Sequence, residues 1–125
     1  MESAKIKLSE AIRLGSSLPG YNWWSPQNCA VGKAMEAAGA SKKERTGWIA
    51  FKKLWPWTEG ILVSAPARYP YYTSTDIPLQ ISHMANKNQG HSVEEIATWI
   101  ESLEDLYLKR EAENERTVLS NTELS

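Results

Sequence analysis

The sequence predicts a mainly α-helical protein, built as a single compact helical domain of about five helices. A long C-terminal amphipathic helix and at most a minor extended segment complete this expected fold. Three observations predict it: apolar residues recur at helical spacing, two S-x-x-E capping boxes mark helix starts, and the β-branched run at 61–63 is only three residues long. The chain of 125 residues has the length of one domain, which we expect at 1–116, followed by a flexible C-terminal tail at 117–125.

The first two helices are expected at residues 7–18 and 26–38. The first has apolar residues at helical spacing, and Gly15 weakens its interior. The second has Ser25 as N-cap and Gly39 as the residue that follows its C-terminal end. Its side chains are mostly small, which lets another helix approach closely. We therefore expect the second helix to lie at the centre of the fold.

The middle of the chain predicts two further helices joined by a loop. A capping box at Ser41 and Glu44 opens a helix over 42–55, and the proline at position 56 stops it. We expect the run at 61–63 to form a short strand or a buried connection, and residues 64–76 to form a long loop. Asp76 can cap a fourth helix over about 78–87.

The final helix has the clearest pattern in the chain. Ser92 and Glu95 form a second capping box. An apolar stripe follows on one face of the helix, with acidic residues opposite, and the helix is expected to continue to about residue 115. The stripe consists of Val93, Ile96, Ala97, Ile100, Leu103 and Tyr107.

Charge and cysteine usage exclude several classes of protein. The formal net charge of −1 gives no general reason to expect nucleic acid, although residues 41–90 are near +4 and residues 91–125 near −6. The two segments can therefore face each other in the fold. A single cysteine excludes an internal disulfide and a zinc site with several thiolates. The polar start and the lack of a long apolar run favour a cytoplasmic protein without cofactor, metal or membrane partner.

Aromatic residues in or beside the loops between the expected helices favour a protein-binding function. The chain has six tryptophans, and tryptophan, tyrosine and arginine are typical anchors of protein interfaces. We expect the turn at 55–57 and the tyrosine-rich loop to form one exposed face. Its partner-binding residues are Trp55, Trp57, Arg68, Tyr69, Tyr71 and Tyr72.

Two alternative functions use other residues. The basic face of the helix at 42–55 could bind nucleic acid through Lys42, Arg45, Lys52 and Lys53. A hydrolase could use Cys29 as nucleophile, because it is expected in the first turn of a helix, with His83 or His91 as its base. A packed, inert Cys29 is the reading that we favour.

Several stretches carry a resemblance to other sequences: Asn28–Gly39, Ile81–Asn86 together with Ser92–Glu101, Leu8–Gly15, and the Trp-Pro-Trp at 55–57. They resemble an uncharacterised group of small bacterial and phage proteins. Members of that group often carry further cysteines before the Ile-x-His segment, which suggests a zinc knuckle, whereas residues 58–80 of this chain contain none. The resemblance implies a phage or prophage setting, in which small accessory proteins often bind host proteins.

Together these observations predict a small non-enzymatic binding or regulatory protein that acts on a host protein through an aromatic and basic surface. The long final helix could also pair with itself, which would give a homodimer.

Overall fold

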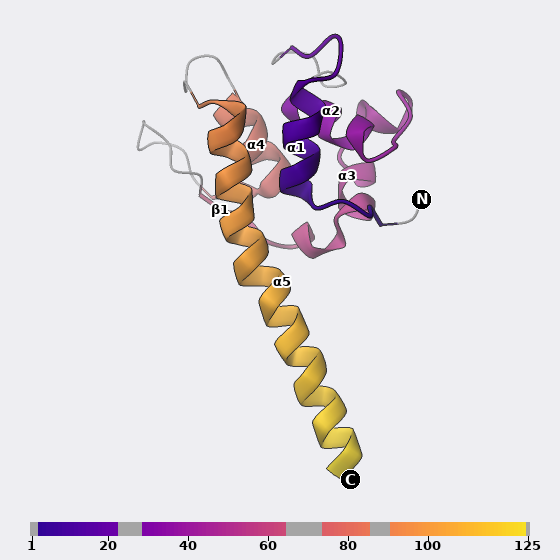
Figure 1. Cartoon of the computed structure of the whole chain (residues 1–125), viewed down its shortest axis with the longest axis vertical. Helices are drawn as coiled ribbons and strands as arrows, with labels where there is room; N and C mark the ends of the chain where they lie inside the picture. Colours follow the sequence, from indigo (N-terminus) through magenta and orange to yellow (C-terminus); the bar gives the residue numbers. More distant parts are fainter. Residues whose placement is uncertain (1–2, 23–28, 65–73, 86–90, 125) are drawn as a thin grey trace.

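The structure, a computed structural model of the whole chain, describes residues 3–22, 29–64, 74–85 and 91–124. Within these residues helices dominate, which confirms the predicted mainly α class (Figure 1). The α-helices are α1 (Leu8–Ser16), α2 (Ala30–Ala37), α3 (Ile49–Leu54), α4 (Ile77–Ala85) and α5 (Val93–Leu124). The shorter elements are the 3-10 turns η1 (Glu44–Thr46) and η2 (Pro56–Thr58) and the strands β1 (Leu62–Val63) and β2 (Thr75–Asp76).

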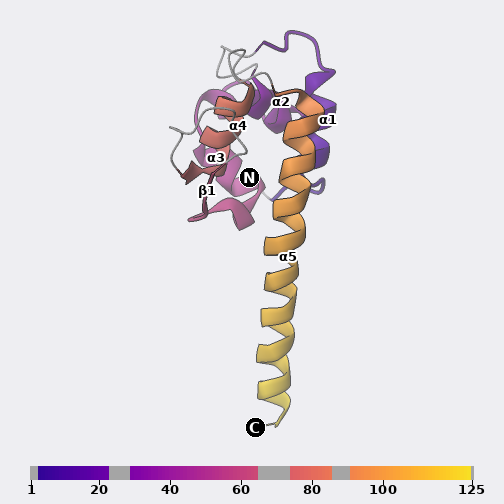
Figure 2. The same cartoon turned by 90° about the vertical axis from the view of Figure 1, so that its left-hand side faces the viewer.

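The molecule consists of a compact body and a projecting arm. Figures 1 and 2 show α1 to α4 gathered beside the N-terminal half of α5, while the C-terminal half extends away from them. The 32 residues of α5 give a helix of about 48 Å at the usual rise of 1.5 Å per residue. The expected end near residue 115 is wrong, because α5 continues to Leu124 and includes most of the predicted tail. No glycine or proline interrupts residues 93–124, so the sequence lacks a stop signal there.

The core lies where α1, α2, α4 and α5 meet. Leu8, Met35, Ile81 and Ile100 are all fully buried, one from each of these helices. α1 and α2 approach closely, as the small residues of α2 predict. A Cβ atom placed on Gly15 would lie 2.5 Å from the carbonyl carbon of Lys33.

Local signals fix most helix ends. In both capping boxes the glutamate accepts a hydrogen bond from the serine N–H, at 2.8 Å for Ser41 and 3.2 Å for Ser92. α2 ends in a Schellman motif, since Ala40 N–H donates to Met35 O at 2.9 Å and Gly39 has φ of +97°. The start of α2 differs from the prediction: the helix begins at Ala30 with Cys29 at the N-cap.

The helix expected at 42–55 is divided, so that prediction is wrong. η1 covers Glu44–Thr46, and α3 begins only at Ile49. Gly47 separates them in an extended conformation, with φ of −154° and ψ of −178°. Glycine disfavours a helix interior because it loses the most backbone freedom there.

A short two-stranded sheet precedes α4 in the chain. β1 and β2 pair antiparallel, with Leu62 opposite Asp76. The strand reading of the 61–63 run is therefore confirmed, whereas β2 is not predicted by the sequence. Asp76 also caps α4, since its carboxylate accepts a hydrogen bond from Leu79 N–H at 3.2 Å.

Polar contacts attach α5 to α1. Ser9 Oγ donates to the buried carboxylate of Glu104 at 2.5 Å. Arg13 forms ion pairs with Glu94, at 2.9 Å, and with Glu101, which lie two turns apart on the same face of α5. These acidic residues therefore face α1 rather than the basic segment at 41–90, which corrects the expectation from the charge asymmetry.

Candidate binding trough

The N-terminal segment, residues 3–7, has no helix or strand, bends at Lys5 and Ile6, and lies across the end of α3. Ala4 N–H donates to Leu54 O at 2.7 Å, and the Trp55 indole N–H donates to Ile6 O at 3.1 Å. Ala4 and Ile6 are half-buried, while the residues between and beside them are exposed. The segment therefore forms a low wall on the surface, and hollows adjoin it on both sides.

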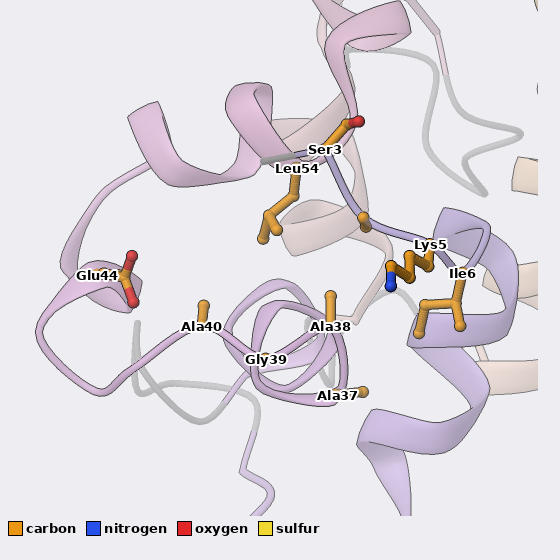
Figure 3. A pocket seen from close by; sticks show the side chains of 10 residues that line it. Ser3, Lys5, Ile6, Ala37, Ala38, Gly39, Ala40, Glu44 and Leu54 are labelled. Carbon is orange, nitrogen blue, oxygen red and sulfur yellow. The ribbon is translucent and has the colours of Figure 1, made fainter. Parts of the chain in front are cut away.

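The first hollow has a volume of about 470 Å³. Figure 3 shows the Leu54 side chain pointing towards the methyl groups of Ala38 and Ala40, with Lys5 at one end of the hollow and Glu44 at the other. Because α2 ends here in small residues, the floor is open enough to accept an apolar side chain. The first hollow thus combines an apolar floor with one charge of each sign at its ends.

Two further hollows continue from the first towards α5. The second, of about 190 Å³, shares the N-terminal segment and Leu54 with the first and is also lined by Trp57. The third, of about 570 Å³, shares Lys7, Glu104 and Leu108 with the second. We call these three adjoining hollows the trough. It runs from η1, past the N-terminal segment and η2, to the point where α5 leaves the body.

Aromatic rings line the middle of the trough. Trp57 is half-buried in η2, and its ring stacks on that of Tyr107 in α5, with 6.4 Å between centroids and 24° between planes. Offset stacking of this kind is a favourable arrangement of aromatic rings. The contact ties η2 to α5 and leaves part of the indole open to a partner.

The rim of the trough is mainly basic near α5. Lys5, Lys7 and Lys109 are exposed there beside one exposed carboxylate, Asp105. The Glu104 carboxylate is buried and accepts a hydrogen bond from Ser9 Oγ. At the other end, the hydrogen bond from Ser41 N–H lowers the pKa of Glu44. Glu44 is therefore ionised at neutral pH, and the charge of the nearby Lys53 acts in the same direction.

The six predicted partner-binding residues do not share one outcome in the structure. Trp57 lines the trough, as an exposed or partly exposed anchor should. Trp55 was expected to be exposed, and this is wrong: it is only 3% exposed, its indole N–H is satisfied by Ile6, and its ring packs 5.1 Å from that of Phe51. The other four predicted residues, Arg68, Tyr69, Tyr71 and Tyr72, lie outside the described residues.

The predicted basic face is split. Arg45 is buried, donates to Ala40 O at 3.0 Å and lies 3.8 Å from the Glu36 carboxylate. Lys52 forms an ion pair with Asp76 at 3.9 Å, while Lys42 and Lys53 are exposed. The break at Gly47 explains this result, because the four basic residues no longer share one helix.

Cys29 and His83 lie on different helices of the body. Cys29 caps α2 and is 7% exposed, packed in the core as favoured from the sequence. His83 is half-buried in α4. Within residues 3–22, 29–64, 74–85 and 91–124, no group of three or more histidine, cysteine or acidic residues could hold a metal ion. In the same ranges, no helix has the length and apolar character to span a membrane.

The sequence interpretation missed the N-terminal segment as part of a site. One signal was present: residues 3–7 alternate between polar and apolar side chains, a pattern typical of a half-buried extended segment. The small residues at the end of α2 were noted for helix packing, but they also form the floor of the first hollow.

Comparisons with known proteins add no further information on the site. No family model, no curated protein and no solved structure matches this chain.

Proposed function

We propose that the protein is a non-enzymatic binding protein that holds a segment of a partner protein in the trough. The supporting observation is the continuity of the three hollows, which share lining residues from α2 to α5. A concave, largely apolar surface with a few charged groups at its rim is typical of binding sites. Such a surface can bury apolar anchors of a partner while its rim sets the charge that the partner should carry.

The lining suggests the chemistry of this partner segment. The first hollow, with its alanine floor and Leu54, fits an aliphatic or aromatic side chain. Trp57 offers a partly exposed ring near the centre, where interface anchors usually contribute most. Lys5, Lys7 and Lys109 favour acidic residues in the partner segment.

The two alternatives have less support. Nucleic-acid binding through the basic residues at 42–53 would use grouped, exposed cations, whereas Arg45 is buried and Lys52 is paired with Asp76. A hydrolase centred on Cys29 would require the thiol to meet its substrate, but the residue is 7% exposed.

A quantitative capture experiment tests the proposal. The tagged wild-type protein and its variants would be incubated with a bacterial host lysate, and the captured partner would then be titrated as a purified protein. We expect Trp57→Ala and Lys5→Glu to weaken binding, Trp57→Ala by about tenfold or more. Leu62→Ala is the matched control, because Leu62 is 69% exposed and lies outside the trough.

The three variants separate the outcomes. Circular dichroism would confirm that each variant is folded, and Lys5→Glu guards against a packing effect of Trp57→Ala, since Lys5 is exposed. Equal binding by the wild-type protein and both trough variants would contradict the proposal. So would a loss of binding in Leu62→Ala alone.

A further inference from the structure

We infer that the trough binds the C-terminal part of α5 from a second copy of this chain, so that two copies exchange arms. The inference rests on the proposed function, because it names the partner segment for the same trough. We define the arm as residues 110–124, which follow Lys109, a residue that lines the third hollow of the trough.

The backbone of the arm leads away from the body. Its fifteen residues extend for about 22 Å at the rise of an α-helix, and Figures 1 and 2 both show this part of α5 pointing away from α1 to α4. Most of the stability of a helix in a protein comes from tertiary packing. A second surface that covers the arm would therefore stabilise it.

Charge makes the trough of another copy a suitable surface. Residues 110–124 contain four glutamates and two arginines, a formal charge of −2. The end of the trough nearest α5 carries the exposed Lys5, Lys7 and Lys109 and one exposed carboxylate, Asp105. The resulting excess of positive charge complements an acidic helix.

The position of the trough also suits a two-fold arrangement. The third hollow, lined by Lys7, Leu108 and Lys109, lies where the arm leaves the body. A second arm that runs antiparallel beside the first would reach this hollow and continue towards Trp57. The first arm would reach the trough of the second copy in the same way. Both contacts would be identical, as in a closed dimer with two-fold symmetry.

Sedimentation velocity of the full chain tests this arrangement through charge reversal. The trough variant carries Lys5→Glu and Lys7→Glu, and the arm variant carries Glu111→Lys and Glu115→Lys. Over about 1 to 100 µM, we expect a dimer of the wild-type chain and a dissociation constant raised about tenfold or more in each variant alone. An equal mixture of the two variants should form a heterodimer, because acidic trough then meets basic arm and basic trough meets acidic arm.

A control with the same change of charge is Lys42→Glu with Lys43→Glu, because both lysines are exposed and neither lines the trough. This control should dimerise like the wild-type chain. A monomeric wild-type chain at about 100 µM in low salt would overturn the inference. Dimers that both variants retain, or a mixture that stays monomeric, would also overturn it. A monomer that still loses a lysate partner on Trp57→Ala would overturn the arm exchange alone and keep the proposed function.

Discussion

Gly15 sets the distance between α1 and α2. A Cβ atom at this position would lie 2.5 Å from both the carbonyl carbon and the oxygen of Lys33, and 2.8 Å from the nitrogen of Ala34. These are backbone atoms inside a helix, so they cannot move aside as the end of a flexible side chain could. From the sequence, this glycine only weakens its helix, whereas in the fold it permits the close approach of α1 and α2.

Replacement of Gly15 by alanine should therefore destabilise the protein. We expect Gly15→Ala to lower the free energy of unfolding by about 1–3 kcal/mol in urea denaturation, although alanine favours a helix. Gly47→Ala is the control, because a Cβ there meets nothing within 4 Å, and its effect should stay within about 0.5 kcal/mol. A Gly15→Ala variant as stable as the wild-type protein would contradict this account of the α1–α2 contact.

The contact between Lys33 and Glu36 is a second feature at the residue scale that affects stability. Lys33 is buried, and its ammonium donates to Pro19 O at 2.5 Å and to Glu36 Oε2 at 2.7 Å. The hydrogen bond from Lys33 lowers the pKa of Glu36. A carboxyl group with a lowered folded-state pKa stabilises the fold above its ordinary pKa, and this contribution disappears as the pH falls through the lower value.

The stability of the wild-type protein should accordingly exceed that of Glu36→Gln at about pH 7, and the difference should shrink towards about pH 3. Urea denaturation of both proteins across this range measures the effect. If the difference between the two proteins stays constant with pH, Glu36 does not titrate through its contact with Lys33.

At the scale of elements, α5 is one helix in two environments. Its N-terminal half is attached to α1 through Glu104 and the Arg13 ion pairs, and Tyr107 stacks on Trp57. The backbone of the arm beyond Lys109 leads away from the body (Figures 1 and 2). Local stability should therefore fall along the helix, because the contacts that attach α5 to the body lie in its N-terminal half.

Hydrogen exchange can measure this gradient. In dilute solution, amides of residues 96–108 should exchange about 100-fold or more slowly than those of residues 112–124. Protection of the arm should rise with protein concentration if two copies exchange arms, while that of residues 96–108 stays unchanged. Equal protection of the two halves in dilute solution would contradict a body-and-arm organisation of α5.

At the scale of the whole molecule, the trough depends on segments far apart in the sequence. The N-terminal segment, Leu54, Trp57 and Leu108 lie together only because α1 and α5 pack side by side and α3 ends beneath residues 3–7. The assembly of these segments also brings Lys5 and Lys7 close to Lys109 on α5.

Salt should weaken the proposed association of two copies. Raising the ionic strength from about 0.05 M to about 0.5 M shortens the screening length of exposed charges several-fold, so the attraction between an acidic arm and a basic trough falls. Sedimentation velocity should show a larger dimer dissociation constant at high salt. An association that strengthens with salt would instead indicate an apolar contact.

The sequence by itself determined the mainly α class, both capping boxes, the Schellman end of α2 at Gly39 and the cap at Asp76. These features depend on side chains within a few residues of the backbone groups that they satisfy, so a short stretch of sequence contains all the partners. Only the tertiary structure decided that Trp55 and Arg45 are buried and that residues 3–7 help to form a trough. Each of these depends on groups supplied by distant segments, such as the Ile6 carbonyl that accepts the Trp55 N–H and the Ala40 carbonyl that accepts from Arg45. The spacing of residues along the chain does not indicate which distant groups become partners when the helices pack.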